Sequence, residues 1–326
     1  MLRAIVLGDT HIEKLNNLFP NGLEKTLWSW QYAINYCEEN SIDHLIQLGD
    51  IFDSPYPSQY SIRKLLRILH GTKVQIWSML GNHDYDADHN SVELAQWVTN
   101  LKGSGPVIFT KPTLQKIEGV NFWFAPYPHT KQPKEKAVCI GHFDMPGARM
   151  DNGRLIKGKK LKLTMPWIIG HLHSFQDYKN VVYPGAPLQF TFGDQPEKFM
   201  LDITVLKGKL KWQAIPLQTP FKLKNIIIEH EKNLIFKEER DTYYKLFIKS
   251  NIRLPENFLL ENPKILKLDG YKTKEQLEAI QIDNVDTKAI NVDPFYKLDH
   301  WLLGKGLKPK QVRKAVKIAQ RELERI

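Results

Sequence analysis

Five short polar motifs, each beginning with glycine, follow apolar runs in the first half of the chain. They are GDTH at residues 8–11, GDIFD at 49–53, GNHD at 81–84, GH at 141–142 and GHLH at 170–173. The apolar runs before them have the length and composition of buried strands. In open α/β sheets, ligands bind beyond the carboxyl ends of the strands. We therefore expect a fold that brings these five strand ends together at one site.

The apolar pattern between the motifs alternates between strand and helix. Strands are expected at residues 2–7, 45–48 and 74–80, and helices at 23–37, 62–69 and 92–101. More closely spaced strands follow at 121–125, 137–140, 167–169, 181–183, 199–205 and 210–215, and three more at 222–229, 244–248 and 263–268. This order predicts an α/β fold that begins with parallel strands joined by helical crossovers and becomes rich in strands later.

Composition limits the class of protein. The 326 residues are 42% hydrophobic, which allows a substantial core and indicates one large domain with a smaller addition. No apolar run approaches the ~20 residues of a membrane span, and the start of the sequence has no signal-peptide pattern. We interpret the chain as cytoplasmic, in the host cytoplasm if it is viral, and without a membrane partner. Cys37 and Cys139 match neither a CxxC nor a zinc pair, so no disulfide is expected.

The side chains of the five motifs indicate metal binding. Taken singly, each motif has an ordinary structural explanation, because Gly-Asp is a common turn, GNH could form a capping turn and HLH could be a polar strand edge. Together they offer carboxylates, imidazoles and an amide, which suit Mn²⁺, Fe²⁺ or Zn²⁺. These ligands are too many for one ion. The sequence therefore predicts two divalent metal ions.

The order of the motifs resembles that of the calcineurin-like, dinuclear metallophosphoesterases over residues 9–173. The resemblance implies a β-sandwich flanked by helices. It assigns Asp9, His11 and His173 to the first metal, Asn82, His142 and His171 to the second, and Asp50 to both. It also implies that His83 acts as a general acid or stabilises the charged transition state, with Asp53 orienting its imidazole. For Asp84 we expect a structural role, such as binding loop amides.

Two further stretches are similar to the SbcD-type nuclease subunits of that family. The second motif continues as GDIFDSPYPSQYS, and residues 183–203 resemble the stretch after the last metal motif. Protein phosphatases of the superfamily carry GDXVDRG and GNHE instead. The nearest match is to the phage recombination endonuclease subunits. The resemblance implies 3′–5′ exonuclease activity on duplex DNA and endonuclease activity on single strands, with Mn²⁺, in recombination and double-strand-break repair.

Two other functions stay open from the sequence. A metal-dependent phosphodiesterase acting on small nucleotides or other diesters would use the same ligands. A non-catalytic scaffold on the same fold would lack several of them. All seven ligands and His83 are in place here, which favours an enzyme.

Basic residues are unevenly distributed within the formal net charge of +10. One cluster covers residues 149–162, between the fourth and fifth motifs, and another covers 303–326. A basic run is commonly a solvated face, but clustered Lys and Arg also suit an anionic polymer such as DNA. Because the first cluster lies between two metal motifs, it is expected to border the metal site.

The expected organisation has four parts. Residues 1–215 form the nuclease domain, residues 216–282 a small α+β capping domain or an accessory domain without nucleic-acid contact, and residues 283–294 a linker. Residues 295–326 form C-terminal helices, the last of them amphipathic with a basic face. This helix could pack on its own core. The SbcD-type resemblance instead implies that it binds an SbcC-type coiled-coil ATPase, with a homodimer of the nuclease within a heterotetramer.

Overall fold

The structure is a computed structural model that describes residues 1–86, 105–151, 153–159, 161–235, 238–255 and 257–271. It forms two compact units, Met1–Leu223 and Lys224–Ile326. The expected helix at 92–101, the linker at 283–294 and the C-terminal helices at 295–326 lie outside the described residues. Within the described ranges, no helix combines the length and the apolar character needed to cross a membrane.

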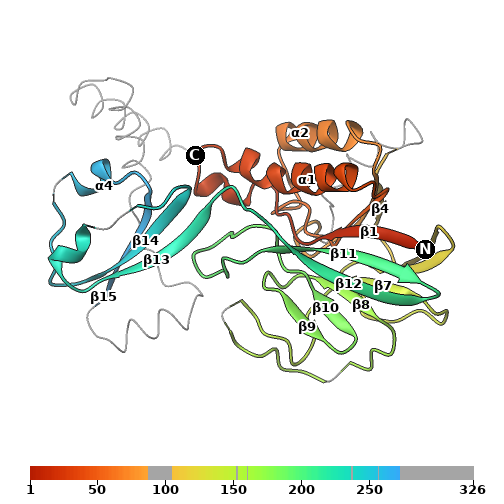
Figure 1. The fold of residues 1–326 in the computed structure, drawn as a ribbon. Coiled ribbons are helices and arrows are strands. Elements are labelled where there is room, and N and C mark those ends of the chain that lie inside the picture. The colour runs from red at the N-terminus through yellow and green to blue at the C-terminus, as the bar shows by residue number, and fades with distance from the viewer. Residues whose placement is uncertain (87–104, 152, 160, 236–237, 256, 272–326) are drawn as a thin grey trace. The chain divides into compact units, whose positions relative to one another are not determined.

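Two six-stranded sheets form the first unit (Figure 1). Their strand orders are β12-β11-β1-β2-β3-β4 and β5-β6-β7-β8-β10-β9. The strands are β1 Leu2–Leu7, β2 His44–Gln47, β3 Gln75–Met79, β4 Val107–Phe109, β5 Thr113–Ile117, β6 Val120–Ala125, β7 Val138–His142, β8 Trp167–Gly170, β9 Gln176–Tyr178, β10 Val181–Tyr183, β11 Phe199–Leu206 and β12 Lys209–Pro216. The helices are η1 Lys14–Asn17, α1 Gly22–Glu39 and α2 Gln59–His70. This β-sandwich with helices confirms the predicted fold class.

Parallel pairing aligns the strand ends that carry the motifs. In the first sheet β1, β2, β3 and β4 are parallel, and in the second sheet β6, β7, β8 and β10 are parallel. β11 and β12 then extend the first sheet in antiparallel fashion. The sequence analysis missed β4, β5 and β9. All three are short strands at sheet edges, where half-exposed residues such as the TLQKI of β5 carry little apolar signal.

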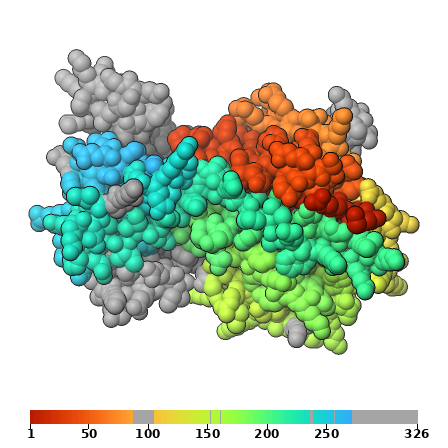
Figure 2. All heavy atoms as spheres, in the orientation of Figure 1, coloured from red at the N-terminus to blue at the C-terminus, as the bar shows by residue number. Residues whose placement is uncertain are grey.

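Alternating side chains along β1 separate two cores. Ile5 and Leu7 belong to the cluster beneath α1 and α2, which includes Trp30. Ala4 and Val6 belong to the cluster between the two sheets. Successive residues of a strand point to opposite faces, so β1 is buried on both sides. In Figure 2 the red and orange atoms of the helical layer lie directly against the green atoms of the strands.

The described part of the second unit is built on a three-stranded sheet in the order β13-β14-β15. Its elements are β13 Lys222–Ile228, η2 Glu231–Leu234, β14 Thr242–Lys249, α4 Phe258–Glu261 and β15 Ile265–Tyr271. Ile228, Leu246 and Phe258 lie in its core. Three strands were expected close to these positions. In the first unit, Cys37 and Cys139 are both buried and both free.

Candidate metal centre

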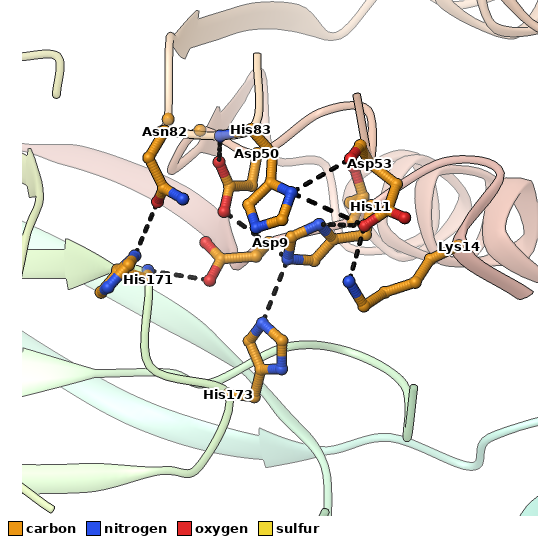
Figure 3. A network of polar contacts seen from close by, with 12 residues as sticks. Asp9, His11, Lys14, Asp50, Asp53, Asn82, His83, His171 and His173 are labelled. Carbon is orange, nitrogen blue, oxygen red and sulfur yellow. Dashed lines mark hydrogen bonds and ion pairs between the residues drawn. The ribbon is translucent and has the colours of Figure 1, made fainter. Parts of the chain in front are cut away.

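The five motifs meet where strands of both sheets end (Figure 3). Asp9 and His11 follow β1, Asp50 follows β2, Asn82 follows β3, His142 ends β7, and His171 and His173 follow β8. Six of these seven side chains form two groups whose ligand atoms lie within 4.8 Å of one another. The groups are Asp9, His11 and His173, and Asp50, His142 and His171. The structure therefore brings the predicted ligands together in two sets, and their binding of metal stays a prediction.

Asn82 and Asp50 complete and connect the two groups. The amide oxygen of Asn82 lies 3.0 Å from Nε2 of His142 and 2.7 Å from Nδ1 of His171. Oδ2 of Asp50 lies 3.3 Å from Nε2 of His142 in one group and 3.5 Å from Nε2 of His11 in the other. One carboxylate oxygen thus faces imidazole nitrogens of both groups, which is the position that a residue serving two metals requires.

Several buried acceptor atoms face the centre without a donor to satisfy them. Oδ1 of Asp9 is buried and has no hydrogen-bond partner among the described residues. Nδ1 of His142 must donate to the backbone oxygen of Leu48, at 2.8 Å, because a carbonyl oxygen only accepts. In a neutral ring the lone pair of Nε2 would then face Oδ2 of Asp50, another acceptor, so either a proton on Nε2 or a metal ion has to lie between the two atoms. Buried acceptors in such contact need a cation between them, so this donor set fits divalent metal ions.

The pKa values in the centre also depend on positive charge. Burial raises the pKa of Asp9 well above its usual range. Burial alone would raise the pKa of Asp50 as well, but the neighbouring rings of His142 and His11 lower it far below its usual range. For His142, burial alone would lower the pKa, and the carboxylates of Asp50 and Asp9 raise it to about 10. The buried carboxylates are therefore stabilised as anions only where a cation is close.

Glycines in these motifs make room for the ligands. A Cβ at Gly170 would lie 2.6 Å from Oδ1 of Asp9 and 2.9 Å from Nδ1 of His142. A Cβ at Gly81 would overlap the carboxylate and the backbone nitrogen of Asp50. The glycine of GNHD is therefore required by the close approach of a neighbouring loop.

The ligand-bearing loops also hold strained backbone. His11, Asp50 and His171 have φ angles of 38°, 49° and 90°. These values lie in the left-handed region, which residues other than glycine rarely adopt. Such conformations persist only where surrounding contacts fix them, and they gather at functional sites. Asp84 supplies part of this fixation.

The carboxylate of Asp84 ties the second motif to the third. It accepts hydrogen bonds from the backbone nitrogens of Gly81 at 2.9 Å and of Ile51 and Phe52 at 3.1 Å. Burial and the nearby Asp50 raise its pKa to about 6. The expected structural role of Asp84 is confirmed, since its contacts fix the loops that carry Asp50 and Asn82.

Replacing Gly81 by alanine should destabilise the protein by about 1–3 kcal/mol, the usual cost of overpacking a close-packed site. The added methyl group must displace Asp50, so binding of divalent ions should weaken as well. Urea unfolding and metal titration measure the two effects. Gly71→Ala is the matched control, because Gly71 has a φ of −81° at the end of α2 and an added Cβ would come no closer than 3.2 Å to its neighbours. Equal stability of both variants would contradict the packing argument.

The contact between Asp53 and His83 differs in its atoms from the sequence prediction. Nδ1 of His83 lies 3.0 Å from the backbone oxygen of Asp53 and 3.7 Å from its carboxylate. The carboxylate lies closer to Nζ of Lys14, at 2.6 Å, and to Nδ1 of His11, at 3.3 Å (Figure 3). The sequence analysis missed Lys14, because a single lysine three residues after His11 belongs to no recognisable motif.

Other carboxylates lie behind the predicted ligands. Oδ2 of Asp151 is 3.6 Å and Oδ2 of Asp194 is 4.0 Å from Nδ1 of His173. Oδ1 of Asp151 also accepts a hydrogen bond from Ser174 at 3.0 Å. Because Asp151 belongs to the basic cluster at 149–162, that cluster borders the centre, as expected. Neither Asp151 nor Asp194 belongs to a motif, so the sequence analysis assigned no role to either of them.

Comparison with known proteins agrees with this geometry. Residues 2–175 match the family profile described as calcineurin-like phosphoesterase. A protein of Invertebrate iridescent virus 3 that is named as a phosphoesterase is 24% identical over 272 residues, which cover 75% of each chain. Exonuclease subunit 1 of Enterobacteria phage T4 is 25% identical over 216 residues, which cover 60% of this chain and 62% of the phage protein. The chain thus spans less than two thirds of the phage protein's length.

Proposed function

Because the chain belongs to the calcineurin-like phosphoesterase family, we propose that it hydrolyses phosphodiester bonds with two divalent metal ions and that its substrate is DNA. The observation that carries this proposal is the position of Oδ2 of Asp50 between the two groups of predicted ligands. A set of carboxylates, imidazoles and one amide suits Mn²⁺, which we propose as the native ion.

The predicted ligands give each ion a place. Asp9, His11 and His173 would hold the first, Asn82, His142 and His171 the second, and Asp50 both. Bound there, the two ions would provide a nucleophile at neutral pH and stabilise charge on the attacking and leaving oxygens. The chain itself orients the ligands. The bond from Nδ1 of His142 to Leu48, for example, fixes the ring so that Nε2 faces the centre.

His83 is the group that we propose for proton transfer. Its side chain is 39% exposed, whereas the ring of His142 is fully buried. Its Nδ1 donates to the backbone oxygen of Asp53, which leaves Nε2 available to a substrate. In the protonated ring, Nε2 can give its proton to the departing oxygen. The Asp53 carboxylate lies farther from Nδ1, at 3.7 Å.

Three observations favour DNA over small diesters. The phage T4 relative is named as an exonuclease subunit. The GDIFDSPYPSQYS stretch resembles SbcD-type nucleases, whose 3′–5′ exonuclease and single-strand endonuclease activities we propose here. The basic cluster at 149–162 borders the centre through Asp151, and its Arg149, Arg154, Lys157 and Lys159 are exposed. Exposed cations beside a phosphoesterase site suit a chain of phosphates.

Removal of divalent metal should abolish activity. Protein treated with a chelator should be inactive, and Mn²⁺ should restore cleavage of linear duplex DNA, single-stranded DNA and bis(p-nitrophenyl) phosphate. Initial rates on the three substrates are the measurement. Full activity without any divalent ion would contradict the proposed mechanism. Cleavage of the small diester alone would favour the small-diester alternative.

Replacing Lys157, Lys159 and Lys160 by alanine should weaken DNA binding alike for all sequences. For each phosphate that the variant no longer neutralises, the slope of log K against log salt should become shallower by about 0.9, because fewer counterions are released on binding. Titrations of labelled duplex DNA at several salt concentrations measure this slope. Alanine at Lys207, Lys209 and Lys211, three exposed lysines in the β11–β12 turn and the start of β12, gives an equal change of charge as a control. The same slope in both variants would identify residues 157–160 as a solvated face.

The partnership with an SbcC-type ATPase stays a proposal from the sequence, because the amphipathic tail at residues 295–326 lies outside the described ranges. Deletion of that tail, followed by co-purification with the ATPase, would test it.

A further inference from the structure

One oxygen atom of Asp53 is approached by three side chains beside the metal centre. Oδ1 lies 2.6 Å from Nζ of Lys14, 3.3 Å from Nδ1 of His11 and 3.7 Å from Nδ1 of His83 (Figure 3). The contact with Lys14 is the shortest and joins two opposite charges, so it is the strongest of the three. Of the three side chains, Lys14 therefore makes the closest and strongest contact with this carboxylate.

Backbone pairing between two loops places Lys14 next to Asp53. The nitrogens of Thr10 and His11 donate to the backbone oxygen of Asp50 at 3.0 and 2.9 Å. Further along both loops, the nitrogen of Asp53 donates to the backbone oxygen of Ile12 at 3.0 Å. The nitrogen of Lys14 in turn donates to the oxygen of His11 at 3.0 Å. The start of η1 is thus fixed to the loop of the second motif, and the lysine has a defined position.

The backbone oxygen and the side-chain carboxylate of Asp53 contact different residues. Its backbone oxygen accepts from Nδ1 of His83, at 3.0 Å. Its carboxylate is thereby left to lie behind His11, whose Nδ1 is buried and has no aligned hydrogen-bond partner among the described residues. Nε2, the other nitrogen of His11, faces Nε2 of His173 at 3.1 Å. A carboxylate behind a ligand histidine commonly fixes the ring and the nitrogen that carries the proton.

Lys14 places a positive charge beside a further group of ligand-type side chains. His11, Asp53 and His83 form a third group whose ligand atoms lie within 4.8 Å of one another. The ammonium of Lys14 supplies the cation for this group. Its side chain is only 23% exposed and lies 5.9 Å from the ring of Phe190. A partly desolvated ion pair of this kind is held more firmly than a pair on the open surface.

On the basis of the proposed metal centre, we propose that Lys14 is a positioning residue for the first metal. Its ammonium holds the Asp53 carboxylate behind Nδ1 of His11, so that the ring presents Nε2 to the ion. Without Lys14, the Asp53 carboxylate, which is 32% exposed, would be free to turn toward water. His11 would then lose its orientation, although no direct ligand had been removed. Asp53 in this arrangement serves the metal through its carboxylate and His83 through its backbone.

Titration with Mn²⁺ by calorimetry tests this role. The wild-type protein should bind two ions, and Lys14→Met should weaken one of the two by about 10- to 100-fold, the usual effect of losing support behind a ligand. Asp53→Asn should weaken the same ion, and Lys14→Arg should restore most of the affinity because it keeps the charge. Lys64→Met is the control and should bind both ions like the wild type. Lys64 resembles Lys14 in being a half-buried lysine beside an aromatic ring, 5.2 Å from that of Tyr60, but it lies on α2.

Two outcomes would overturn the inference. One is Lys14→Met with both affinities of the wild type, even where Asp53→Asn weakens one ion. The other is equal weakening of both ions together with a lowered melting temperature, which would indicate a general loosening of the fold. If the wild-type protein bound no divalent ion, the proposed function itself would fail, whereas two ions bound equally well by wild type and Lys14→Met would reject the lysine's role alone.

Discussion

Replacing Asp50 by alanine is expected to remove both metal ions and nearly all activity. Oδ2 of Asp50 faces imidazole nitrogens of both ligand groups, so its loss weakens both positions at once. Two-metal catalysis supplies several kcal/mol of charge stabilisation, and each 1.36 kcal/mol is a factor of ten in rate. The rate should therefore fall by at least about 10³-fold. Metal content of the purified protein and initial rates of diester cleavage are the measurements.

Two further variants separate metal binding from folding. Oδ1 of Asp50 also accepts the backbone N–H of His83 at 2.8 Å, so alanine disturbs the loop as well. Asp50→Asn keeps an acceptor for that N–H and removes the charge, and it should still lose metal. Asp43→Ala, an exposed carboxylate just before β2, should retain both ions. Two ions in Asp50→Asn at wild-type affinity would contradict the shared position.

Replacing His83 by glutamine is expected to lower the rate by about 10²- to 10⁴-fold while both metal ions remain bound, because general acid catalysis contributes that much. Glutamine keeps the backbone N–H that binds Asp50, and its amide can still donate to the backbone oxygen of Asp53. It cannot donate a proton to a departing oxygen. Rates under saturating Mn²⁺, together with metal content, distinguish this loss from that of the Asp50 variants.

An exposed histidine provides the control for His83. His129 lies on the loop after β6 and is exposed, so His129→Gln should cleave at the wild-type rate. Wild-type activity in His83→Gln would show that the ring has no part in the chemistry. Loss of metal in that variant would instead place His83 among the ligands, as its grouping with His11 and Asp53 allows.

Much of the fold could be predicted from the sequence, because buried strands and amphipathic helices have a local signature. The strands at 181–183 and 199–206 agree with the prediction almost to the residue, since their apolar side chains fill the space between the sheets. The edge strands β4, β5 and β9 were missed, because they have only three to five residues and most of their side chains are not fully buried, which leaves too short an apolar pattern. Pairing of distant segments, such as β1 with β11, has no local signal at all.

The chemistry of the site was determined by the sequence itself. Gly-Asp, Gly-Asn-His and Gly-His at successive strand ends fix both the kind of ligand and the order in which the ligands occur. Because parallel strands end at the same edge of a sheet, the first three motifs meet at the edge of one sheet and the last two at the edge of the other, and packing of the two sheets joins the two sets. The seven predicted ligands required no knowledge of side-chain contacts.

Tertiary structure decided how each ligand is supported. Lys14 and Asp53 are 39 residues apart, and they meet only because the loops after β1 and β2 pair through their backbones. The same pairing gives His83 the backbone oxygen of Asp53 and leaves the carboxylate to His11. Residue type and spacing are local properties that a sequence displays directly. A contact of about 3 Å between distant side chains depends on strand register, backbone torsion and rotamer, which are set only when the whole core has packed.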